Sequence, residues 1–286
     1  MIKSLWSSAW AVIDIKIQQA DTACPWEWRT YMGLWTMTHL YQLTITILVF
    51  LGISIFAAKT LGKCKAQTRY IPLQVIAVIL LVLEVMKQIN AAKSGTYDMY
   101  ALPFHYCSLF LYLLPLHAFY HGKYSHVTDT AAFACLASLF FDMLVMPENI
   151  YSASCVLDLF GSFSNFHTVI FHNLVLLYFM LTIALRLYKI DTKHDMKVMT
   201  VFLAIYVTIA AILSYTLKVN FHNLYRCNIG FIEDVRLAVV DAIGVFGTIL
   251  YVVILFILTI LFAYAAYFLT RLIIKVVDKI SGKKSA

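Results

Sequence analysis

Residues that can transfer a proton or attack a carbonyl lie inside or beside otherwise apolar stretches of this sequence. They carry carboxylate, imidazole, thiol or carboxamide groups, and they are Glu84, His105, Cys107, His167, His172, Asn173, Asn220 and Asn223. A polar side chain within a membrane costs a few kcal/mol unless it finds a partner. Imidazoles and carboxylates serve in proton transfer, and thiols in nucleophilic attack. These residue types therefore indicate either a catalytic centre or a pocket for a proton or a solute.

One apolar stretch carries three polar residues on a single helical face. Glu84, Lys87 and Gln88 stand at i, i+3 and i+4, the spacing at which helical side chains are neighbours. We therefore expect Glu84 either to pair with Lys87 one turn along or to hold the tautomer of a histidine. The simple pair is the favoured interpretation.

The spacing of the histidines makes neighbouring side chains diverge. His105 and Cys107 are two residues apart, about 200° around a helix. They do not both face one cavity unless the helix begins irregularly, so a structural hydrogen-bonding role is favoured for His105. His167 and His172 are five apart, about 140°, so one of them faces elsewhere.

The elements that must position these residues are membrane-spanning helices. Of 286 residues, 62% are apolar and 13% are charged, whereas soluble domains have about a quarter of their residues charged. The net charge of +7 comes from short basic clusters between the apolar stretches, a pattern typical of topology determinants. We expect a multi-pass integral protein of the cell membrane whose partners are membrane lipids, with no nucleic-acid partner.

Seven apolar stretches have the length of about 20 residues that a helix needs to cross a bilayer. They are residues 37–58, 70–89, 101–120, 128–146, 166–185, 196–217 and a seventh within 239–274. The predicted fold is all-α, a polytopic membrane helix bundle with seven transmembrane helices. We expect a leading interfacial segment over 1–36, a membrane domain over 37–274 and a basic cytoplasmic tail over 275–286.

The charges between the stretches predict the orientation. Fourteen Lys and Arg residues fall on one side of the membrane and seven on the other, and the richer side is usually cytoplasmic. The N-terminus is therefore expected outside and the C-terminus inside. In that orientation the polar residues gather near the outer ends of their spans, which predicts a polar cavity open to the outer leaflet. The alternative is that they end helices and reach water.

Four short motifs resemble those of a known membrane protein family. LPFHYC at 102–107 resembles the LPLHLC signature of the YwaF-type integral membrane proteins of bacteria, which are related to the animal transmembrane protein 164 family. VMPENIY at 145–151 is similar to that family's proline–acidic segment, and FHTVIFHNLVLLY at 166–178 to its histidine-bearing fifth helix. The segment 220–223 is similar to its Asn-rich stretch. The resemblance covers residues 37–270.

The resemblance implies an enzyme. The animal relatives are acyltransferases that move fatty-acyl chains between phospholipids with a Cys nucleophile and a His, and a distant fold relation is implied to membrane hydrolases of lipid esters. By motif, the nucleophile falls on Cys107 and the base on His172, with His167 as the alternative. The acyl group would pass to Cys107 and then to a lysophospholipid hydroxyl or to water. Side-chain amides can polarise the carbonyl oxygen, and the candidates are Asn173, Asn220 and Asn223.

A second function stays open from the residues alone. A transporter or receptor could bind a proton or a solute with Glu84, Lys87, Asp142 and the histidines. The internal repeat that is typical of transporters is not apparent in the sequence, which favours the enzyme.

No cofactor and no metal site is expected. His117, His121 and His126 have spacings that could suit a metal, but they lack a nearby acidic or thiol partner, so a solvated turn is favoured. Cys155 and Cys227 lie in outer loops and could form a disulfide, with Cys24 as an alternative partner. The oligomeric state stays open.

Overall fold

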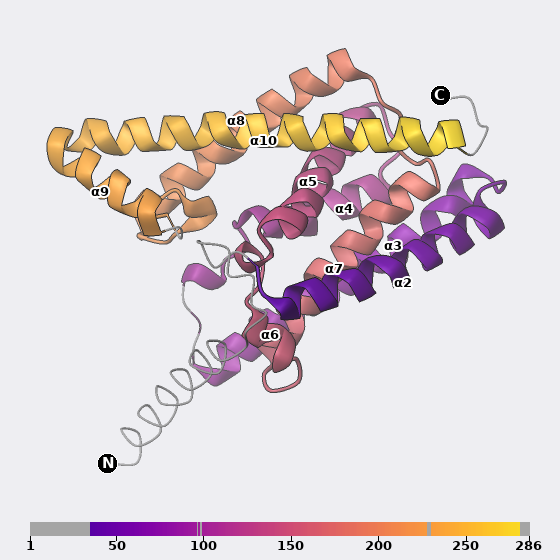
Figure 1. The fold of residues 1–286 in the computed structure, drawn as a ribbon, viewed down its shortest axis with the longest axis horizontal. Coiled ribbons are helices and arrows are strands. Elements are labelled where there is room, and N and C mark those ends of the chain that lie inside the picture. The colour runs from indigo at the N-terminus through magenta and orange to yellow at the C-terminus, as the bar shows by residue number, and fades with distance from the viewer. Residues whose placement is uncertain (1–34, 96, 98, 228–229, 281–286) are drawn as a thin grey trace.

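The protein is an all-α bundle, as the sequence predicts. The computed structural model describes residues 35–95, 97, 99–227 and 230–280 (Figure 1). Its α-helices in these ranges are α2 (Met37–Leu61), α3 (Ala66–Ser94), α4 (Phe110–Phe119), α5 (Ser125–Val145), α6 (Ala153–Leu157), α7 (Phe163–Ala184), α8 (Thr192–Leu217), α9 (Gly230–Ile243) and α10 (Val245–Ile280). Short 3-10 turns join them: η1 (Met99–Ala101), η2 (Tyr106–Leu109), η3 (Pro147–Asn149) and η4 (Phe221–Asn223).

Six of the described helices are long and apolar enough to cross a membrane: α2, α3, α5, α7, α8 and α10. The stretch expected as a third span, 101–120, instead forms the shorter apolar helix Tyr106–Phe119. Its 14 residues rise only about 21 Å, less than the roughly 30 Å of hydrocarbon. A turn containing Pro103 precedes it, and proline disfavours helical geometry in the residue before it. The protein is therefore a multi-pass membrane protein with a shortened helix inside its bundle.

The expected seventh span divides into two helices at Gly244. This glycine has a φ of +60°, a conformation that ordinary residues rarely adopt. α9 folds back against α10 at one end of the molecule (Figure 1). The approach is close at Gly247, where an added Cβ would stand 2.7 Å from the Val239 carbonyl oxygen. α10 has 36 residues, so it exceeds the bilayer thickness unless it tilts or extends beyond it.

Helix caps set the other boundaries. Thr36, Ser162 and Asp191 each accept a hydrogen bond from the backbone N–H three residues on, which satisfies a free donor at the start of α2, α7 and α8. Gly95 ends α3 in the left-handed conformation, with a φ of +67°.

The core lies where α5 meets α4, α7, α8 and α10. Residues 131–139 of α5 are buried and mostly small, and small residues let transmembrane helices approach closely. Outside this core the helices present large apolar side chains, among them Ile249, Leu258 and Leu272 of α10. Lipid can solvate such a surface, whereas water cannot.

Candidate functional site

Glu84 of α3 is the centre of a polar cluster that also reaches α7. Its Oε1 accepts hydrogen bonds from Gln88 Nε2 at 2.6 Å and contacts Lys87 Nζ at 2.8 Å. Its Oε2 stands 3.5 Å from His167 Nε2. Glu84 therefore makes both predicted contacts, the pair with Lys87 and the approach to a histidine. Gln88 also donates to the Ala101 carbonyl at 2.8 Å, which ties η1 to α3.

The other α7 histidine, His172, faces a different part of the bundle. Its Nδ1 lies 2.7 Å from the Thr168 carbonyl oxygen, and a carbonyl can only accept, so Nδ1 carries the proton. In the neutral ring Nε2 is then the nitrogen with a free lone pair. The ring packs 6.0 Å from that of Tyr151. His167 and His172 thus diverge, as their spacing predicts.

Asn173 belongs to a network of three side chains that join α2, α7 and the loop after α5. Its Oδ1 accepts from Gln42 Nε2 at 3.1 Å, and Gln42 Oε1 accepts from the Tyr151 hydroxyl at 2.9 Å. Asn173 Nδ2 donates to the Val169 carbonyl at 2.7 Å. The side chain of Asn173 is engaged at both ends, so it serves first to fix the helices.

His39 of α2 completes this region and was not foreseen from the sequence. It is fully buried, and its Nε2 donates to the Tyr151 carbonyl oxygen at 2.9 Å. Its Nδ1 lies 3.1 Å from the Thr36 hydroxyl and 3.5 Å from Glu148. A histidine next to the N-cap of an apolar helix was the available signal for this contact, together with the acidic residue in the 145–151 motif.

Cys107 lies in η2, directly before α4, and is partly exposed. Burial raises the pKa of the Cys107 thiol, and the positive charge of Lys87 acts against that rise. Within residues 35–95, 97, 99–227 and 230–280, no hydrogen bond joins the Cys107 sulfur to an imidazole. Cys107 and His172 come from different elements, η2 and α7, and no hydrogen bond joins them in the part of the chain that the structure describes.

His105 has a structural environment. Its Nε2 donates to the Tyr100 carbonyl oxygen at 3.1 Å, and its ring packs against Phe221 at 5.1 Å. Burial lowers the pKa of His105, because a charged ring loses its hydration there. These contacts agree with the hydrogen-bonding role favoured from its spacing.

His222, in the η4 turn, packs against Tyr106, the residue that precedes Cys107. Its ring stacks on Tyr106 at 5.2 Å, and its Nε2 is 3.0 Å from the Thr259 hydroxyl of α10. Burial, with the neighbouring His105, lowers the pKa of His222 to about 4, so the ring is neutral at physiological pH. This histidine has a φ of +52°, which marks a tightly determined turn.

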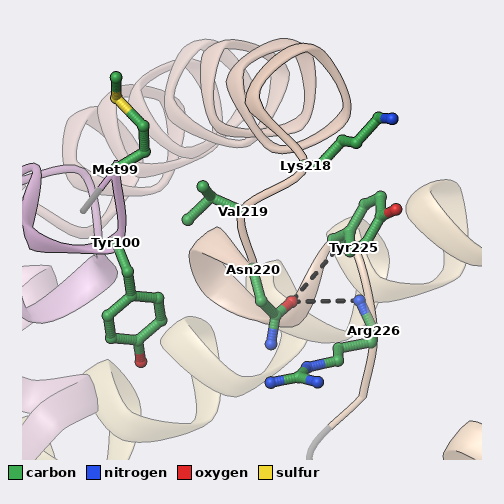
Figure 2. Close-up of a pocket in the computed structure, with 7 residues that line it drawn as sticks. All are labelled: Met99, Tyr100, Lys218, Val219, Asn220, Tyr225 and Arg226. Atoms are coloured by element: carbon green, nitrogen blue, oxygen red, sulfur yellow. Dashed lines mark hydrogen bonds between the residues drawn. The ribbon is translucent and has the colours of Figure 1, made fainter.

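Asn220 and Asn223 organise the loop between α8 and α9. Asn220 Oδ1 accepts from the backbone N–H groups of Tyr225 and Arg226, at 3.3 and 3.1 Å (Figure 2). Asn220 Nδ2 donates to Asn223 Oδ1 at 3.4 Å, and the Asn223 carbonyl accepts from the Tyr251 hydroxyl at 2.5 Å.

A cavity of about 300 Å³ opens between this loop and η1. It is lined by Met99, Tyr100, Lys218, Val219, Asn220, Tyr225 and Arg226 (Figure 2). In Figure 2 the Arg226 side chain extends beneath the Asn220 amide, whereas Lys218 points away from it. The cavity therefore joins a guanidinium to carboxamide and phenol groups, a combination suited to a phosphate or another anion.

The cysteines and the remaining histidines are placed as follows. Cys155 and Cys227 are free thiols, and Cys24 lies outside the described residues. His117 is buried with its Nδ1 2.7 Å from the Tyr178 hydroxyl, and His121 packs on the Tyr70 ring. Among the described residues, His117 and His121 therefore do not join His126 in a cluster of possible metal ligands.

Comparison with known proteins identifies the family. No curated protein and no solved structure matches this chain. The model of the TMEM164 family matches residues 34–267, a range that includes Glu84, Cys107, His172 and the 220–223 loop. With most of its length matched, this chain belongs to the TMEM164 family.

Proposed function

We propose that this protein acts on phospholipid esters in the membrane, transferring the acyl chain or hydrolysing the ester, with Cys107 as nucleophile and His172 as base. The observation that carries the proposal is the position of Cys107. A partly buried thiol stands at the start of a shortened helix, within the electrostatic influence of Lys87, which pairs with the buried Glu84. Charged side chains within a membrane are energetically costly, and a role in activating the thiol would explain why Glu84 and Lys87 are present.

The chemistry follows from the states of the two groups. His172 Nε2 has the lone pair that takes the thiol proton, because Nδ1 is bound to the Thr168 carbonyl. The sulfur attacks the ester carbonyl, the carbon–oxygen bond breaks, and the imidazolium returns the proton to the lysophospholipid oxygen. A second hydroxyl, or water, then attacks the thioester and releases the thiol. The positive charge of Lys87 favours the anionic sulfur during attack.

His172 is favoured over His167 as the base because of their partners. His167 Nε2 faces the Glu84 carboxylate at 3.5 Å, so this ring nitrogen is directed at Glu84 and not at a thiol. The cavity beside η1 would hold the lipid headgroup, with Arg226 near its phosphate. The polar region is proposed to face outside, with the C-terminus inside.

The test uses the full chain in liposomes that contain a phosphatidylcholine with one labelled acyl chain and an unlabelled lysophospholipid. The wild type is expected to release or transfer the label. Cys107→Ala should lower the rate by at least about 10³-fold, because the covalent step is lost. Cys155→Ala, which removes another partly exposed thiol, should leave the rate unchanged. Equal rates for wild type and Cys107→Ala would overturn the thiol mechanism.

The alternative function is that of a proton-coupled carrier or receptor, and the contact of Glu84 with both Lys87 and His167 is the observation that favours it. Such a carrier would move protons into liposomes that hold a pH-sensitive dye, and Glu84→Gln would stop the movement while Cys107→Ala would not.

A further inference from the structure

A second polar cluster lies away from the proposed acyl site. His126 is in the first turn of α5, and His194 and Asp195 are in the first turn of α8. The packed helices α4 and α5 are joined by the short loop 120–124, so they run in opposite directions. The start of α5 is therefore at the end of α4 opposite to Cys107.

The three side chains converge on one point. One ligand atom from each lies within 4.8 Å of those of the other two. His126 Nε2 is 3.4 Å from Asp195 Oδ1, and the His126 and His194 ring centroids are 4.5 Å apart. Ligand atoms about 2.0 Å from a tetrahedral ion stand about 3.3 Å from one another. The His126–Asp195 distance fits that value, and His194 offers a third ligand atom within 4.8 Å of the other two.

Hydrogen bonds hold the Asp195 carboxylate in one orientation, as they usually do for a carboxylate that binds a metal ion. It is fully buried, and its Oδ2 accepts from the Tyr267 hydroxyl at 2.6 Å and from the Asp191 N–H at 2.9 Å. Its Oδ1 accepts from the Thr130 hydroxyl at 3.1 Å and keeps a lone pair on the side of the imidazoles. Such second-shell bonds orient a carboxylate for a metal ion, and a buried carboxylate needs a positive partner.

We propose that His126, His194 and Asp195 bind one divalent transition metal ion, with Zn²⁺ as the best fit. Two imidazoles and a carboxylate suit Zn²⁺, whereas Ca²⁺ and Mg²⁺ prefer oxygen ligands throughout. The His126 side chain is 40% exposed, which gives the ion a path of entry and leaves the fourth position to water. The bound ion joins α5 to α8 and, through Tyr267, to α10.

The test uses the full chain without a histidine tag, purified in detergent and freed of metal by a chelator. Titration with ZnCl₂ is expected to show one bound ion per chain. His126→Gln and His194→Gln should each weaken Zn²⁺ binding by at least about 100-fold. Removing a ligand lowers the affinity more than removing a residue that only orients a ligand, which costs about 10- to 100-fold. The matched control is His121→Gln, which changes an exposed histidine in the loop before α5 and should leave the affinity unchanged.

Two results would overturn the site. One is a wild type that binds no Zn²⁺ at micromolar concentration; the other is a ZnCl₂ titration that the two Gln variants leave unchanged. The absorption spectrum of the wild type with CoCl₂ is a second test. It needs no variant, so it remains informative if a variant fails to fold. Tetrahedral Co²⁺ bands without thiolate charge transfer are expected, whereas an octahedral spectrum or a thiolate band would place the ion elsewhere.

Discussion

Among single residues, Tyr151 connects the Gln42–Asn173 pair to His39. Its hydroxyl donates to Gln42, which in turn donates to Asn173, and its backbone carbonyl accepts from His39. Only the hydroxyl is lost in Tyr151→Phe. The free energy of unfolding should fall by about 1–2 kcal/mol, because a part-buried Gln42 oxygen loses its donor. Thermal unfolding in detergent measures this. Tyr97→Phe, at an exposed tyrosine, is the control, and an equal effect of both changes would contradict the role of the network.

His222 makes stability depend on pH. Its pKa in the folded protein is about 4 because of burial, below its usual value of about 6.5. The unfolded chain therefore binds the extra proton between pH 6.5 and 4, so stability is full above 6.5 and falls as the pH decreases. The slope from this residue is at most about 1.4 kcal/mol per pH unit.

His222→Asn should flatten that slope, since asparagine tolerates the positive φ without titrating. Unfolding midpoints between pH 7 and pH 4.5 give the measurement. His121→Asn, at an exposed histidine, should leave the wild-type slope in place. An unchanged slope in His222→Asn would show that other groups carry the dependence.

Gly244 sets the boundary between two elements, α9 and α10. An added Cβ would meet no atom within 4 Å, so only the φ of +60° opposes a side chain. Gly244→Ala should therefore destabilise the fold by about 1–2 kcal/mol. Gly52→Ala, also in open space but inside α2, should be neutral or stabilising. Thermal unfolding of the two variants distinguishes backbone strain from a general effect of added methyl groups.

The sequence predicts helices better than their interruptions. Apolar runs predict α2, α3, α5, α7 and α8 within a few residues, because each must bury its backbone hydrogen bonds in lipid. Two breaks escape this signal. Hydrophobicity does not show that the stretch at Pro103 begins as a turn and a 3-10 segment, nor that Gly244 reverses the chain, because both depend on backbone conformation.

The same limit applies to the candidate site. Spacing along one helix predicts that Glu84 reaches Lys87 and that His167 and His172 diverge. It cannot predict the contact of Gln42 with Asn173, or the meeting of His126 with Asp195. Those pairs come from different helices, and only the packing of the bundle brings them together.

The whole molecule has an expected orientation that can be tested by labelling. Cys64 is an exposed thiol between α2 and α3, and Phe160, beside α6, is 85% exposed. With the N-terminus outside, position 160 faces outside and Cys64 faces inside. In chains that keep a single cysteine, an impermeant maleimide should label Phe160→Cys in intact cells and Cys64 only after permeabilisation. The reverse pattern would invert the topology and place the polar cluster on the cytoplasmic side.

The most direct measurement is the mass of the protein after incubation with a phospholipid ester. Wild-type protein in liposomes should gain one acyl chain, located on Cys107 by peptide mass spectrometry and released by neutral hydroxylamine, as a thioester requires. His172→Ala should lower the amount of this adduct, and Cys107→Ala should abolish it. A protein that turns over the lipid without an acyl group on Cys107, or with the group on another residue, would contradict the mechanism.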